Sequence, residues 1–159
     1  MPDAPLTTLA LVVLGLAAWS TVVGERVRPV VLQRLAAWAA APTLQLTMLR
    51  AAAVELAGLM VLSAWSLTAW VLGGVLGSVL PTRALLLAAA ATLGPLWWAQ
   101  ARVRPGVETT AASLEALGLS AVQARTVAAL ALLGSAASVL VLLSVGAPSL
   151  WSPDGWGPG

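Results

Sequence analysis

Four long apolar runs constrain the fold of this chain more than any other feature. They cover residues 6–23, 51–72, 84–100 and 126–145, and Glu55 is the only charged residue inside them. A helix needs about 20 predominantly apolar residues to cross the hydrocarbon core of a bilayer. Only 9% of the chain is charged, whereas a soluble domain carries about 25% charged residues. The sequence therefore predicts an all-α, polytopic membrane protein with four transmembrane helices.

A short basic cluster, Arg-Val-Arg-Pro, occurs twice, at residues 26–29 and 102–105. Each copy follows an apolar run, and a stretch of mixed polarity with a further arginine leads to the next run. Aligning the copies places Arg50 within one residue of Arg125. The same alignment superposes Gly58 on Gly134.

The repetition predicts one membrane domain over residues 1–159, built as a pseudo-repeat of residues 6–80 and 82–146 with an irregular tail at 147–159. Each half holds two spans, so the two halves have the same orientation and form tandem parallel hairpins.

Arginine placement predicts the orientation. Only Arg83 lies near the loop between the second and third runs, and the other seven lie in or beside the first and third loops: Arg26, Arg28, Arg34, Arg50, Arg102, Arg104 and Arg125. Positively charged loops stay in the cytoplasm. We expect a multi-pass protein of the cell membrane with cytoplasmic Arg-Val-Arg-Pro loops and both termini outside.

The mixed segments at residues 30–49 and 107–117 predict short interfacial helices, because their apolar residues recur at helical spacing. We expect the first span to end at residues 24–29. Thr82 is predicted to cap the third span, and Ser120 with Gln123 is predicted to form a capping box at the start of the fourth.

Glu55 is the one acid predicted to enter the membrane, about 7 Å beyond Arg50 at 1.5 Å per residue. A carboxylate in this position is a candidate for a proton or cation relay. The alternative is that Glu55 reaches the membrane surface or pairs with Arg50, Arg102 or Arg125.

The basic residues could bind anionic lipid headgroups or an acidic segment of a partner, or could only anchor the topology. The candidates for such contacts are Arg26, Arg28, Arg34, Arg102, Arg104 and Arg125. Small residues on the second and fourth spans predict close helix packing. The residues singled out for this role are Gly58, Ser66, Gly73, Gly134, Ser135 and Ser138. The hydroxyls among them could instead line a polar path.

The residue inventory disfavours an enzyme. The chain has no Cys, no His and no Lys, so the usual nucleophiles and bases are missing, and we expect no catalytic residue. Without Cys and His we expect no metal site and no cofactor. The net charge of +2 is too small and too localised to predict nucleic-acid binding.

The layout of span, basic-Pro turn, amphipathic segment and span, repeated over most of the chain, resembles the CopD-like four-span membrane domains and their small relatives. The matching residues are Gly15, Arg28-Pro29, Arg104-Pro105 and Arg125. The resemblance implies a helical membrane protein. The histidines expected of copper-linked members are absent from this chain.

Three functions remain open from the sequence. The first is a non-catalytic membrane protein that packs with itself or with a larger membrane complex through its small-residue stripes. The second is a small oligomeric transporter or channel for ions or small solutes, with Glu55 on the path. The third, least favoured by the inventory, is a membrane enzyme acting on lipid. In each case the lipid bilayer is the surrounding partner.

Overall fold

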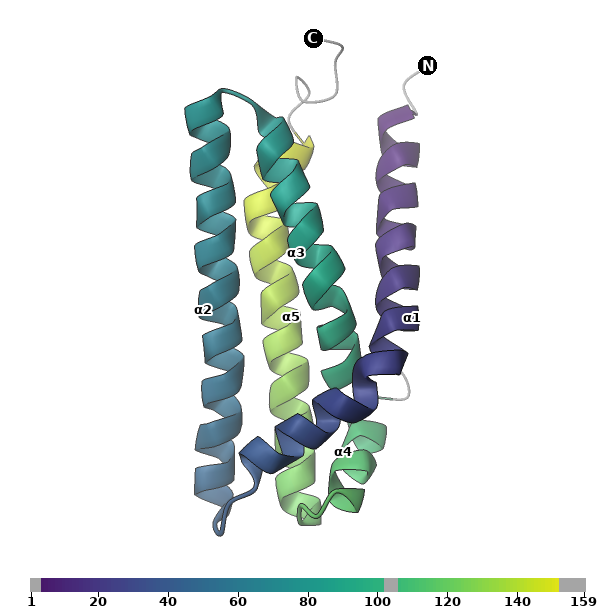
Figure 1. The fold of residues 1–159 in the computed structure, drawn as a ribbon, viewed down its shortest axis with the longest axis vertical. Coiled ribbons are helices and arrows are strands. Elements are labelled where there is room, and N and C mark those ends of the chain that lie inside the picture. The colour runs from purple at the N-terminus through teal and green to yellow at the C-terminus, as the bar shows by residue number, and fades with distance from the viewer. Residues whose placement is uncertain (1–3, 102–105, 152–159) are drawn as a thin grey trace.

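The computed structural model describes residues 4–101 and 106–151, and these residues form an all-helical bundle (Figure 1). Its helices are α1 (Ala4–Ala39), α2 (Leu44–Leu76), α3 (Val79–Gln100), α4 (Val107–Ala116) and α5 (Ala121–Trp151). The predicted all-α class is confirmed. Three stretches are long and apolar enough to cross a membrane: Ala10–Ala39, Leu44–Leu76 and Ala121–Val145. The third predicted span, α3, runs beside them in the bundle but is not among the three.

Helix α1 continues through the first basic cluster, so the predicted end at residues 24–29 is wrong. Pro29 lies inside the helix. Proline removes one backbone hydrogen bond and bends a helix without necessarily ending it. Figure 1 shows the C-terminal part of α1 turning across one end of the bundle. The segment predicted as an interfacial helix at residues 30–49 is therefore the end of α1, a turn, and the start of α2. The second basic cluster lies outside the described residues.

A tight turn at residues 40–43 separates α1 from α2. The Thr43 side chain caps α2 by accepting a hydrogen bond from the Leu46 N–H. At its other end α2 stops at Gly77, whose left-handed conformation (φ 61°) suits glycine best.

Ser78 caps α3, so the predicted cap at Thr82 is wrong. The buried Thr82 hydroxyl donates instead to the carbonyl of Ala69 at 3.0 Å, which ties α3 to α2. Gly73 permits this contact, because a Cβ atom there would collide with the Thr82 side chain.

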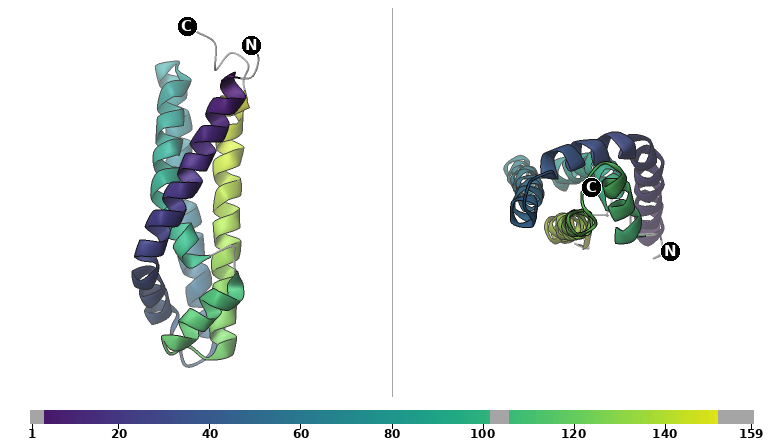
Figure 2. Two further views of the ribbon diagram at one scale, coloured as in Figure 1. Left: turned by 90° about the vertical axis from the view of Figure 1, so that its right-hand side faces the viewer. Right: turned by 90° about the horizontal axis from the view of Figure 1, so that it is seen from below.

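Helix α4 confirms that the segment predicted at residues 107–117 is helical, and Gly118 (φ 102°) follows its end. The capping box is also confirmed: the Ser120 N–H donates to Gln123 Oε1 at 3.1 Å, and the Gln123 N–H donates to Ser120 Oγ at 3.4 Å. Figure 2 shows α4 and the C-terminal part of α1 at the same end of the bundle. The hydrophobic core lies here, with members from four helices: Leu32, Leu35, Ala36, Ala39, Ala51, Ala111, Leu114, Ala124, Val127 and Ala128, together with Leu119 beside them.

Small residues lie at the contacts among α2, α3 and α5. Of the six residues singled out for packing, Gly58 alone is exposed, and the other five are buried: Ser66, Gly73, Gly134, Ser135 and Ser138. Small side chains let helices approach closely in a membrane. The buried members of these stripes therefore pack the chain's own helices against one another, and contact with a second molecule would need another surface.

Candidate functional site

Glu55 lines a cavity of about 150 Å³ between α2, α3 and α5. Three polar side chains face this space, one from each helix: Glu55, Gln100 and Ser138. The remaining lining is apolar or aromatic: Val54, Gly58, Leu62, Leu93, Leu96 and Trp97. The cavity has room for several water molecules or a small ion.

Glycine on the facing helix sets the position of the Glu55 side chain. Gly134 of α5 lies directly opposite, and a Cβ atom there would collide with the Glu55 carboxylate and lie 3.0 Å from its Cβ atom. The absence of a side chain at Gly134 thus creates the space that the carboxylate occupies. The sequence predicted Glu55 inside the membrane, but it did not predict this contact with Gly134.

The carboxylate of Glu55 has no hydrogen-bond or salt-bridge partner among the described residues. The Arg50 guanidinium donates to the carbonyl of Ala40 at 2.6 Å. Arg125 lies 3.8 Å from Glu108, and both side chains are exposed. The pairing of Glu55 with Arg50 or Arg125 therefore does not occur, and Arg102 lies outside the described residues.

The oxygen atoms around the cavity determine which protons or ions could bind there. Carboxylate, amide and hydroxyl oxygens are hard ligands that suit a proton or a small hard cation. Within residues 4–101 and 106–151, no group of three or more His, Cys, Asp or Glu side chains could hold a metal ion. The cavity therefore offers one formal negative charge and two neutral polar groups.

Among the predicted lipid-binding arginines that the structure describes, Arg28 is buried whereas Arg26, Arg34 and Arg125 are exposed. Arg28 is 8% exposed and donates to the carbonyl of Ala99 at 2.9 Å and to Thr110 Oγ1 at 3.2 Å. Ala99 is in the last turn of α3, where a cation also interacts favourably with the helix dipole. Arg28 therefore joins α1 to α3 and α4. Arg26 and Arg34 are exposed, and Arg102 and Arg104 lie outside the described residues.

Sequence analysis missed the hydrogen bonds that tryptophans make between helices. The Trp19 Nε1–H donates to the carbonyl of Ala91 at 2.8 Å. That carbonyl would normally accept from the residue four positions later, which is Pro95 and has no N–H. Trp19 of α1 thus satisfies the acceptor that Pro95 leaves free in α3. The sequence feature that could have predicted this bond is a proline within one apolar helix together with a tryptophan on another.

Replacing Trp19 with Phe is expected to lower the free energy of unfolding by about 1–2 kcal/mol, because the Ala91 carbonyl loses the indole donor in an apolar environment. Unfolding of the purified protein by sodium dodecyl sulfate, followed by circular dichroism, measures the change.

Trp65→Phe is the matched control. Trp65 donates to the carbonyl of Leu85 at 3.1 Å, but Ala89, four residues later, still has an N–H. The control should therefore lose less stability than Trp19→Phe, and equal losses would contradict the role of Pro95.

Comparisons with known proteins found no protein-family model, no curated protein and no solved structure that matches this chain. The resemblance to CopD-like domains therefore stays a prediction.

Proposed function

We propose that this chain is a non-catalytic membrane protein that takes up a proton or a small monovalent cation at Glu55, as part of a small transporter or channel. The observation that supports this function is the unpartnered Glu55 carboxylate at a largely apolar cavity between three helices, which Gln100 and Ser138 also line. Burying a carboxylate in an apolar environment without a counter-charge is costly, so such a group gains by binding a proton or a cation.

The proposal includes α3 as the fourth span. Its 22 residues correspond to about 33 Å of helix, enough for a hydrocarbon core of about 30 Å. The start of α2, the start of α5 and the end of α3 lie towards the same end of the bundle, where Arg28 and Arg50 donate their hydrogen bonds. Arg83 lies near the opposite end of α3. By the positive-inside tendency we place the Arg28 end in the cytoplasm.

Ion flux into liposomes tests the role of Glu55. We expect the wild-type protein to carry protons or sodium ions down a gradient, as followed with pH- and sodium-sensitive dyes inside the vesicles. Glu55→Gln keeps the size and polarity of the side chain but removes its charge, and should reduce the flux at least about tenfold because an isosteric neutral group cannot bind the cation.

Glu115→Gln is the control, because Glu115 lies exposed on α4 and away from the cavity. Its flux should equal that of the wild type. Wild-type flux that survives in Glu55→Gln, or no flux above protein-free liposomes, would contradict the proposal.

A second candidate function is assembly with other membrane subunits or with a second copy, supported by the N-terminal half of α1. Its large apolar side chains are exposed, among them Leu11 and Leu14, each 65% exposed. Gly15 directly follows Leu14 and has open space where a Cβ would stand, so another helix could approach closely there. Native mass spectrometry from membranes would show bound subunits, and a monomer without partners would count against assembly.

A further inference from the structure

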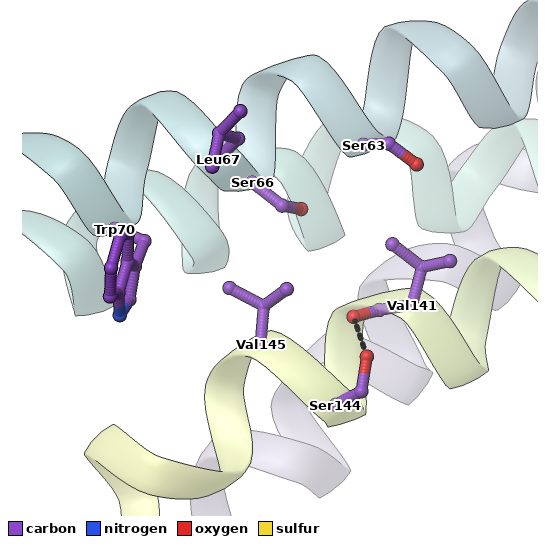
Figure 3. Close-up of a pocket in the computed structure, with 7 residues that line it drawn as sticks. All are labelled: Ser63, Ser66, Leu67, Trp70, Val141, Ser144 and Val145. Atoms are coloured by element: carbon purple, nitrogen blue, oxygen red, sulfur yellow. Dashed lines mark hydrogen bonds between the residues drawn. The ribbon is translucent and has the colours of Figure 1, made fainter.

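A second pocket, of about 410 Å³, lies between α2 and α5 (Figure 3). It begins at Ser63 and Val141, next to the end of the Glu55 cavity at Leu62 and Ser138. Helix α2 contributes Ser63, Ser66, Leu67 and Trp70, and α5 contributes Val141, Ser144 and Val145. The volume falls in the range of pockets that hold small organic ligands. It is far larger than a water molecule or an ion requires.

The pocket contains hydroxyl groups without acceptors. Ser66 is 0% exposed and its hydroxyl has no hydrogen-bond partner, and Figure 3 shows it directed across the pocket towards α5. Ser63, one turn earlier, also makes no hydrogen bond within the described residues. Ser144 is already bonded to the carbonyl of Val141. A buried hydroxyl normally finds a partner, so the free Ser66 donor favours a ligand that brings an acceptor, and the exposed Ser63 hydroxyl offers a second donor at the pocket.

The depth of Ser66 restricts the source of that acceptor. Ser66 is 16 residues beyond Arg50 and 11 before Gly77, or about 24 Å and 17 Å along the helix. It therefore lies well inside the apolar part of α2. Phospholipid headgroups and their ester linkages stay in the interfacial regions of the bilayer. An acceptor at the level of Ser66 must belong to a molecule that dissolves in the hydrocarbon core.

We propose that this pocket binds a membrane-dissolved quinone with an apolar tail, whose ring carbonyl accepts a hydrogen bond from Ser66. Trp70, 62% exposed at one end of the pocket, offers an aromatic face for the quinone ring. Leu67, Val141 and Val145 give an apolar wall for the tail. The proposal concerns binding alone and goes beyond the function proposed for Glu55.

Binding of a decyl-substituted benzoquinone to the protein in lipid nanodiscs tests the inference, with retained quinone measured after rapid filtration. We expect saturable binding of one quinone per chain. Ser66→Ala should weaken this binding about five- to tenfold, the effect of one hydrogen bond. Ser63→Ala provides a second variant on an exposed residue of the same pocket.

Ser135→Ala is the matched control. Ser135 is also a buried serine with an unpartnered hydroxyl, but it lines a separate cavity between α3 and α5. The Ser135→Ala protein should bind the quinone with the affinity of the wild type. The Glu55→Gln protein should do so as well, and this result would separate quinone binding from the proposed transport.

Three outcomes would overturn the inference. One is quinone uptake that never saturates, and another is equal affinity of wild type, Ser66→Ala and Ser63→Ala. The third is a phospholipid that native mass spectrometry finds bound one per chain and that the quinone does not displace, which would assign the pocket to lipid.

Discussion

Replacing Arg28 with Ala is expected to lower the free energy of unfolding by about 3 kcal/mol. The substitution leaves the carbonyl of Ala99 and the hydroxyl of Thr110 without the donor that the buried guanidinium supplies. Each buried group left unpaired costs about 1–3 kcal/mol. The variant should also lose contact between α1, α3 and α4, which hydrogen exchange would detect as faster exchange in α4. Unfolding by sodium dodecyl sulfate measures the stability.

Arg26→Ala is the matched control for Arg28. Both arginines belong to the same four-residue cluster, but Arg26 is exposed, so its replacement should change stability by less than about 0.5 kcal/mol. Arg28→Lys should recover only part of the loss, because an ammonium lacks the planar fork that reaches two acceptors. Equal effects of Arg26→Ala and Arg28→Ala would show that the buried contacts do not stabilise the fold.

Replacing Gly24 with Ala is expected to lower the free energy of unfolding by about 2 kcal/mol. A Cβ atom at Gly24 would lie 2.7 Å from Trp98 Cδ1 and 2.9 Å from both the Pro95 carbonyl oxygen and Trp98 Cβ. Two of these atoms belong to the backbone or to the root of a side chain, so α1 and α3 must move apart. Overpacking of this kind costs about 1–3 kcal/mol. The same movement should break the 3.0 Å hydrogen bond from Trp98 to Glu25.

Gly15→Ala, in the same helix, is the control for Gly24→Ala. A Cβ atom at Gly15 would meet nothing within 4 Å. Here alanine should increase stability by up to about 1 kcal/mol, because it restricts the unfolded chain more than glycine does. Both variants are measured by detergent unfolding, and the tryptophan emission of Gly24→Ala should shift as Trp98 moves. Destabilisation of the two variants by the same amount would contradict a close approach at Gly24.

Some features of the fold could be predicted because they depend on neighbours in the sequence. The capping box of Ser120 with Gln123 involves only residues close together in the sequence. The small stripes of α2 and α5 follow from helical periodicity, which places Ser66, Ser135 and Ser138 on inward faces. The sequence could not predict which helix packs against each stripe, because small residues allow the close approach of any helix.

Other features required knowledge of what lies across from each residue. Pro29 suggested the end of a helix, but α1 continues because Leu32, Leu35 and Ala36 become buried in the core that α1 shares with α2, α4 and α5. Thr82 suggested a cap, but its hydroxyl meets the Ala69 carbonyl of α2. In both cases tertiary contact outweighed a local preference.

The candidate site likewise combines features that the sequence predicts with features that only the tertiary structure shows. The sequence by itself determined that the chain is helical and apolar and that Glu55 lies within an apolar helix, because these properties follow from composition and periodicity. Only the tertiary structure decided that Gly134 faces Glu55, that neither Arg50 nor Arg125 pairs with it, and that Arg28 rather than Arg26 is buried. Those facts depend on the rotation and crossing of helices far apart in the chain, which no local pattern encodes.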